Sequence, residues 1–258
     1  MATLRWRQRR GRVGGAWEGW GRVDPSGDVM LGWGTYAEFC IDPVRGRVQA
    51  TMDDVGQREV VLAFVLSALP LALPLFDLEP LHASSVLIDG SAVLVMGASG
   101  AGKSSTAARL VELDAALLAD DATAIDREGR VWPGPPFLNP RSREAVQPVI
   151  GRFNDKPLRI VPNHDADPHP VGASVALLPR AGAALAIRSL PPKEAFATIL
   201  GHVRAPWFLS GHRRVLQLAV AAALSRSPTG LVVFDESVHD FATVAEGIGS
   251  WVRDRGLG

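Results

Sequence analysis

The sequence predicts an α/β fold built on a mixed β-sheet. An apolar run at 92–96 is followed by a glycine-rich turn and by a helical pattern at 105–111, which gives the order strand, loop, helix. A second strand-like run at 83–88 reaches the first through Asp89-Gly90, a strong short-range signal for a β-hairpin. A strand–loop–helix unit is typical of parallel sheets, whereas a hairpin is antiparallel. The two signals together therefore predict strands of both directions in one sheet.

Two parts are expected along the 258 residues: a small β-rich N-terminal unit over 1–50 and one larger domain over 51–258. The first part contains short alternating runs at 36–41 and 47–50, separated by the turn signal Asp42-Pro43. Hydrophobic residues make up 47% of the chain, which is ample for a sizeable core.

Composition argues against several classes of partner. The 27 basic and 27 acidic residues cancel, so the net charge gives no reason to expect nucleic acid binding. Cys40 is the single cysteine, which excludes an intramolecular disulfide and suits a reducing cytoplasm. The Arg-rich N-terminus lacks the apolar core of a secretory signal. The apolar stretch 60–76 is short for a membrane span and contains Pro70 and Pro74, so we expect a buried helix over about 54–69 and no membrane partner.

The glycine-rich turn carries the motif G-x-x-x-x-G-K-[ST] of the phosphate-binding P-loop. Its glycines allow successive backbone N–H groups to point at one anion, and the following helix N-terminus adds partial positive charge. We expect Lys103 to reach the outer phosphates of ATP and the Ser104 hydroxyl to ligate Mg²⁺. The predicted nucleotide-binding residues are Gly97, Ala98, Ser99, Gly100, Ala101, Gly102, Lys103, Ser104 and Ser105.

Beyond the turn, short runs predict further elements. A buried strand is expected at 115–119 and a hairpin over 123–132, and the Pro- and Asn-rich region 133–170 is typical of long loops rather than core. The remaining predictions are strands within 173–190 and at 231–234, and helices at 194–200, 215–224 and 241–254.

Three polar residues flank the glycine-rich turn. Asp120 and Asp121 follow the predicted strand 115–119, at the strand end where ligands bind in open α/β sheets. Phosphoryl transfer to a hydroxyl needs one carboxylate to hold Mg²⁺ and one group to accept the proton of the acceptor, and adjacent carboxylates could divide these tasks. His82 precedes the hairpin strand and is expected at the same end of the sheet.

These residues resemble the HPr kinase/phosphorylase family. The resemblance rests on Leu81-His82-Ala83-Ser84-Ser85-Val86, then Asp89-Gly90, the P-loop and Leu118-Ala119-Asp120-Asp121, and it covers about residues 81–136. It is closest to shorter HPr-kinase-related proteins, some of which phosphorylate a serine of a peptide product such as a lasso peptide. The family fold, shared with phosphoenolpyruvate carboxykinase, has an antiparallel strand beside the P-loop strand.

By resemblance, Asp120 activates the acceptor hydroxyl, Asp121 belongs to the metal site and His82 lies near the transferred phosphate. The family segment with a Glu-x-Arg-Gly core has no counterpart here, because Pro133-Gly134-Pro135-Pro136 stands in its place. We therefore expect a peptide serine or a small hydroxylated metabolite as acceptor, rather than HPr itself. The family's assembly into oligomers suggests a homo-oligomer.

Two alternatives remain open from the sequence. The stretch 209–214 and the later run ending in Asp235-Glu236 follow the order of an ABC-type ATPase, in which Asp235 would bind Mg²⁺ and Glu236 would polarise water. His212 and Arg213 depart from that signature. The second alternative is a nucleotide-binding regulator without catalysis.

Overall fold

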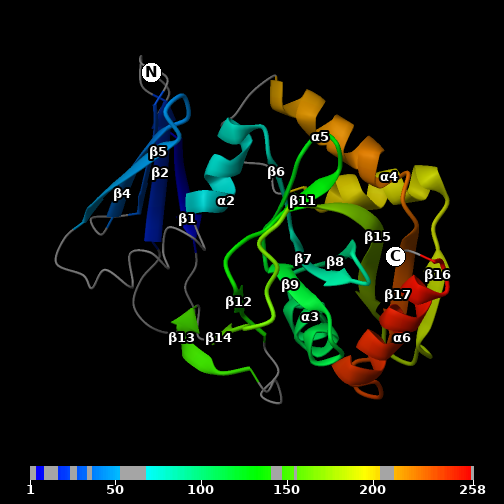
Figure 1. Ribbon diagram of the computed structural model, residues 1–258. Helices are drawn as coiled ribbons and strands as arrows, with labels where there is room; N and C mark the ends of the chain where they lie inside the picture. The colour runs from blue at the N-terminus through cyan, green and yellow to red at the C-terminus, as the bar shows by residue number, and fades with distance from the viewer. Residues whose placement is uncertain are drawn as a thin grey trace. The chain divides into compact units, whose positions relative to one another are not determined.

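The computed structural model describes residues 4–8, 17–23, 28–33, 37–52, 68–140, 147–153, 156–203 and 212–256 (Figure 1). The chain divides into two compact units, which are Met1–Phe76 with Ala205–Ser210, and Asp77–Arg204 with Gly211–Gly258. Within the described residues, no helix is both long enough and apolar enough to cross a membrane.

The first unit contains a five-stranded antiparallel sheet in the order β1-β2-β3-β4-β5. Its buried core includes Leu31, Phe39 and Ile41 from alternate positions of neighbouring strands. Strand β5 runs across position 50, where the sequence suggested a boundary. The strands are β1 (Leu4–Gln8), β2 (Trp17–Val23), β3 (Val29–Trp33), β4 (Ala37–Asp42) and β5 (Arg47–Met52).

The apolar helix expected at 54–69 falls mostly on residues 53–67, which lie outside the described part of the chain. Its expected end near Leu69 is wrong, because Leu69 begins α2 (Leu69–Ala72), which is followed by the 3₁₀ helix η2 (Leu73–Phe76). Pro70 stands in the first turn of α2, where a missing backbone N–H interrupts no helical hydrogen bond.

The second unit is built on a nine-stranded mixed sheet, which confirms the predicted α/β class with strands of both directions. The main path runs β6-β10-β11-β15-β8-β7-β9. Off this path, β17 pairs with β15, and β16 pairs with β17. The strands are β6 (Glu79–Leu81), β7 (Ala83–Ile88), β8 (Ser91–Gly97), β9 (Ala116–Ala119), β10 (Thr123–Ile125), β11 (Arg130–Trp132), β15 (His169–Pro179), β16 (Ala186–Ser189) and β17 (Thr229–Phe234).

Strand β8 lies at the centre of this sheet between partners of opposite direction. It pairs antiparallel with β7 and parallel with β15, which in turn pairs parallel with β17. The predicted hairpin is confirmed, because Asp89 (φ 48°) and Gly90 (φ 83°) form its two-residue turn with both residues at positive φ. The second predicted hairpin is also present, as β10 and β11.

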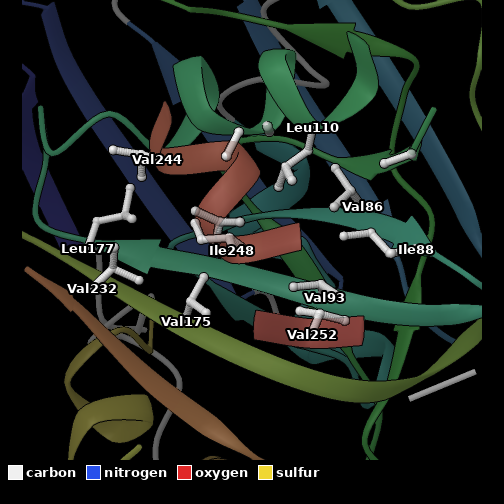
Figure 2. Packing of buried hydrophobic residues seen from close by; sticks show 14 of the residues in the cluster. Val86, Ile88, Val93, Leu110, Val175, Leu177, Val232, Val244, Ile248 and Val252 are labelled. Atoms are coloured by element: carbon white, nitrogen blue, oxygen red, sulfur yellow. The ribbon is translucent and has the colours of Figure 1, made fainter. Parts of the chain in front are cut away.

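Helices cover both faces of the sheet (Figure 1). Helices α3 (Lys103–Glu112) and α6 (Phe241–Arg253) pack on one face, and α4 (Pro192–Gly201) and α5 (His212–Leu224) contribute to the core on the other. Strand β8 serves both cores by alternation, with Val93 and Val95 facing α3 and α6 while Leu94 and Met96 face the opposite side. Figure 2 shows the first of these cores, where strand valines meet Val244, Ile248 and Val252 of α6.

The expectation of long loops over 133–170 is wrong in part. Three short strands form a separate antiparallel sheet in the order β12-β14-β13. Leu138, Leu158 and Val161 in this region are buried, so it contributes to the core. The strands are β12 (Phe137–Leu138), β13 (Val149–Phe153) and β14 (Lys156–Ile160).

Candidate functional site

The glycine-rich loop, defined here as residues 97–102, connects the carboxyl end of β8 to the first residue of α3. Gly100 and Gly102 have φ values of 92° and 95°, which side-chain-bearing residues rarely adopt. A Cβ on Gly97 would come within 3.1 Å of the Leu177 carbonyl oxygen on the neighbouring strand. Backbone conformation and close packing therefore both require glycine in this loop.

The loop lies where the parallel strands β8, β15 and β17 end together, because Gly97 pairs with Leu177 and Pro179 pairs with Phe234. Ala98 and Ser99 are exposed, whereas Ala101 and Ser105 are buried. The side open to solvent is thus the turn itself, next to the N-terminus of α3, where backbone N–H groups have no helical acceptor.

The Lys103 side chain bends back over the glycine-rich loop and is only 6% exposed. Its ammonium donates to the carbonyl oxygens of Gly97 (3.0 Å) and Ala98 (3.1 Å) and lies 3.0 Å from Nε2 of His82. The expectation that His82 reaches the same end of the sheet as the loop is confirmed by this contact. Lys103 is the first residue of α3, the helix whose N-terminus an anion bound at the loop would face.

His82 connects Lys103 to the pair of aspartates. Its Nδ1 lies 3.2 Å from the backbone oxygen of Asp121 and 3.6 Å from the Asp121 carboxylate. Because Nε2 faces an ammonium, which can only donate, the hydrogen-bond pattern assigns the ring proton to Nδ1. Asp121 itself has a positive φ of 65°, so the chain turns sharply just after β9.

Asp120 is held by groups from two other segments of the chain. Its Oδ1 accepts a hydrogen bond from Ser84 Oγ on β7 (2.5 Å), and its Oδ2 accepts from the backbone N–H of Asn139 (2.9 Å). Ser104, in the first turn of α3, is near enough to this carboxyl to add a small lowering of its pKa. Two hydrogen bonds from distant parts of the chain thus fix the carboxylate of Asp120.

Burial dominates the electrostatics of Asp120 and raises the pKa of its carboxyl above the ordinary value. Hydrogen bonds from Ser84 and Asn139 oppose this rise because they stabilise the ionised form, and the nearby charge of Asp121 adds to it. A carboxylate whose pKa is raised in this way is a stronger base than an exposed aspartate.

Ser104 and Asp121 were predicted as metal ligands. Ser104 lies in the first turn of α3, near Asp120, while the Asp121 side chain is 44% exposed beside His82. In the described part of the chain, no group of three or more His, Cys, Asp or Glu residues could hold a metal by itself. One hydroxyl and two adjacent carboxylates are nevertheless oxygen donors that suit Mg²⁺, which binds few protein ligands and completes its shell with phosphates and water.

Three residues of the site had no role in the sequence-based prediction. Ser84 was part of the family resemblance, and its contact with Asp120 depends on the register between β7 and β9. Asn139 binds Asp120 through its backbone N–H, for which no residue type is diagnostic. His202, which follows α4, accepts a backbone hydrogen bond from His82 (2.7 Å), and a single distant histidine gave no signal.

Asp235 directly follows β17 at the same edge of the sheet, and its carboxylate is bound by neighbouring residues. One oxygen accepts from the Gly182 N–H (2.6 Å), and the other accepts from the N–H (2.9 Å) and the hydroxyl (2.7 Å) of Ser237. The Ser237 hydrogen bonds, with that of Gly182, lower the pKa of Asp235. Residues 209–211 of the ABC-like stretch lie outside the described residues, as do the side chains of His212 and Arg213.

Comparison with known proteins gives a distant structural similarity. No protein-family model and no curated protein matches the chain. Among solved structures, the HPr(Ser) kinase/phosphatase from Coxiella burnetii is similar, with 18% sequence identity and a TM-score of 0.39. The match covers 69% of this chain and 90% of that one.

Proposed function

We propose that this chain is a Mg²⁺-dependent kinase that transfers the γ-phosphoryl group of ATP to a hydroxyl. The acceptor in this proposal is a serine of a peptide or a small hydroxylated metabolite. The observation that carries the proposal is the series of contacts from Lys103 through His82 to Asp121, since it joins a phosphate-binding type of loop to the pair of carboxylates that includes Asp120. A kinase needs these two features side by side, with the base within reach of the donor phosphate.

In the proposed reaction, backbone N–H groups of the glycine-rich loop and the ammonium of Lys103 hold the triphosphate. Asp120 accepts the proton of the acceptor hydroxyl, whose oxygen forms a bond to the γ-phosphorus as the bond to the β–γ bridging oxygen breaks. The products are the phosphorylated acceptor and ADP. Lys103 must exchange a contact with Gly97, Ala98 or His82 for a phosphate oxygen as the nucleotide binds.

In this scheme Ser104 and the aspartates would hold the metal ion, and His82 would keep Lys103 and Asp121 in place. When bound, Mg²⁺ neutralises charge on the β- and γ-phosphates. The hydrogen bonds of Ser84 and Asn139 fix the plane of the Asp120 carboxylate. The carboxylate is therefore already oriented before the acceptor binds.

The test of the proposal is phosphoryl transfer by the purified full chain. Mg·ATP labelled at the γ-phosphate is incubated with a panel of serine-containing peptides and hydroxylated metabolites, and labelled products are separated from ATP. We expect stoichiometric ADP and phosphorylated acceptor. Tight ATP binding with no transfer to any member of a broad panel would instead favour a nucleotide-binding regulator without catalysis.

The ABC-type alternative makes a different prediction for Glu236, which is exposed next to the locally bound Asp235. We expect Glu236→Gln to leave phosphoryl transfer and Mg·ATP affinity within about twofold of wild type, a difference below 0.5 kcal/mol. The measurement is the initial transfer rate together with ATP retention after gel filtration. ATP trapped by the variant would instead support an ABC-type site.

Removing the Ser84 hydroxyl tests whether it positions Asp120. We expect Ser84→Ala to lower kcat about tenfold, corresponding to loss of one hydrogen bond to a charged group, with KM for ATP nearly unchanged. Because that hydrogen bond lowers the pKa of Asp120, its loss raises the pKa further, and the acidic limb of the kcat profile moves to higher pH.

The matched control for this variant is Ser85→Ala. Ser85 is equally buried on the same strand, but its hydroxyl accepts from Thr123 (3.3 Å), away from the aspartates. It should change stability alone, with the pH profile of wild type. Equal effects of the two substitutions on kcat would show that the Ser84 hydroxyl does not position Asp120 for catalysis.

A further inference from the structure

Asp235 joins the two loops that follow β15 and β17, and the proposed phosphoryl transfer gives it no task. Its carboxylate accepts from the Gly182 N–H (2.6 Å) in the first loop. In the second loop it accepts from the N–H (2.9 Å) and the hydroxyl (2.7 Å) of Ser237. Residues 180–183 and 235–240 are therefore held together by one side chain, and we call them the paired loops.

The paired loops lie beside the glycine-rich loop. Strands β8, β15 and β17 end at one edge of the sheet, and Phe241, which directly follows the second of the paired loops, packs its ring against Gly102. Along this edge the strands are ordered β17-β15-β8-β7-β9. His82 precedes β7 and Asp120 follows β9, so these two residues lie on one side of the glycine-rich loop and the paired loops lie on the other.

The position of Asp120 decides which way a bound triphosphate points. The proposed function places the γ-phosphate next to Asp120, because the proton acceptor has to reach the hydroxyl that attacks this phosphate. The α-phosphate and the nucleoside then extend away from the aspartates, across the glycine-rich loop and toward the ends of β15 and β17. The surface that the nucleoside meets there is formed by the paired loops.

We propose that the paired loops bind the nucleoside of the triphosphate, with Arg180 and Val238 contacting the base and Asp235 positioning the two loops. This inference rests on the proposed function for the place of the γ-phosphate. Val238 offers an apolar side chain that is 72% exposed, and Arg180 offers an exposed guanidinium directly after β15. A base is a flat ring that packs on apolar groups and stacks on guanidinium planes.

The test compares two ligands that share the phosphates and differ in the nucleoside. Mg·ATP and Mg·tripolyphosphate are titrated separately into the full chain by calorimetry, and the ratio of the two Kd values measures what the nucleoside contributes. We expect wild type to bind Mg·ATP more tightly. Asp235→Asn turns an amide NH₂ toward one of the N–H groups that the carboxylate now accepts from, so the paired loops separate.

We expect Asp235→Asn to weaken Mg·ATP binding about tenfold, as for the loss of one hydrogen bond to a charged group. Binding of Mg·tripolyphosphate should remain that of wild type, because this ligand does not reach the paired loops. A loss of the same size for both ligands would overturn the inference, since Asp235 would then act on the phosphates or on their metal ion. An unchanged ratio of the two Kd values would overturn it as well.

Asp126→Asn is the matched control. The carboxylate of Asp126 likewise accepts from backbone N–H groups of its own turn, those of Glu128 (3.1 Å) and Arg130 (2.8 Å). That turn lies near the start of β15, at the opposite end from the paired loops, because the Gly129 carbonyl accepts from the Val171 N–H (3.1 Å). The ratio of the two Kd values should therefore stay that of wild type.

Should Asp235→Asn fail to fold, the methyl resonances of Val238 in wild type decide. The ring current of a bound base should shift them with Mg·ATP but not with Mg·tripolyphosphate, while those of Leu113, at the far end of α3, should stay in place. Equal shifts of Val238 with both ligands, or none, would overturn the inference. Absence of binding by either ligand would contradict the proposed function as well, whereas an unchanged Kd ratio with normal phosphoryl transfer would overturn this inference alone.

Discussion

Asp120→Asn is expected to lower kcat for phosphoryl transfer by about 10²–10⁴-fold, the range typical of a lost general base. The substitution removes the group that accepts the acceptor proton while keeping its shape. Mg·ATP affinity should stay within a few-fold, because the loop and Lys103 provide most of the phosphate contacts in the proposed site. Single-turnover transfer and equilibrium ATP binding measure the two effects separately.

The same substitution has a predicted effect on stability with a defined sign. Because burial raises the pKa of Asp120 in the folded protein, ionising it costs stability as pH rises above the ordinary aspartate range. Asparagine carries no charge and can satisfy the same partners, accepting from the Asn139 N–H and donating to Ser84 Oγ. We therefore expect the Tm of Asp120→Asn to match or exceed that of wild type at pH 7.5, and the difference to shrink toward pH 4.

Asp126→Asn is the matched control. Burial raises the pKa of Asp126, but hydrogen bonds from Arg130 and Trp132 outweigh it and lower the pKa overall. Stability from this carboxylate is present above the unfolded pKa and is lost as pH falls through the folded one. Asp126→Asn should thus lower Tm at pH 7.5 and leave kcat unchanged.

Phosphoryl transfer at the wild-type rate by Asp120→Asn would disprove the assignment of Asp120 as the catalytic base.

Local sequence signals predicted the part of the fold that presents the candidate site. The β7–β8 hairpin follows from Asp89-Gly90, because few residues other than glycine and aspartate tolerate the positive φ values of its turn. The burial of β8 on both faces also follows from its local sequence, since a strand covered on both sides is apolar throughout. His82 beside Lys103 follows from placing both at one end of adjoining strands.

What the sequence did not predict depends on register and on long-range packing. Ser84 faces Asp120 only because of an irregular pairing between β7 and β9, where one register shift separates Ser85 from Val86. The β12–β14 sheet consists of strands of two to five residues among prolines, too short for periodicity to detect. His202 reaches the site through a backbone contact, which carries no side-chain signature.

Gly102→Ala is the second substitution with a large expected effect, and it separates two reasons for requiring glycine. The backbone at Gly102 has φ 95°, and a Cβ there would lie 2.0 Å from a ring carbon of Phe241, the first residue of α6. Gly90 has a similar φ of 83°, but a Cβ there would meet nothing within 4 Å. Gly90→Ala therefore measures the conformational cost alone, about 1–2 kcal/mol.

We expect Gly102→Ala to lower the free energy of unfolding by more than Gly90→Ala and to weaken Mg·ATP binding about tenfold or more. The ring of Phe241 packs edge-on against Phe234, so it cannot yield without disturbing the core at the end of β17. The loop must move instead, and its N–H groups lose their common direction. Urea unfolding and ATP binding of the two variants give the comparison, in which only Gly102→Ala should affect the nucleotide.

A double-mutant cycle with Phe241→Ala decides whether the clash is the cause. In that background the ring is gone, so the cost of Gly102→Ala should fall to the conformational part measured at Gly90. Nucleotide affinity should recover in parallel, because the loop can then keep its native path. If Gly102→Ala costs the same with and without the ring, then the positive φ alone explains the glycine, and α6 has no part in shaping the phosphate-binding turn.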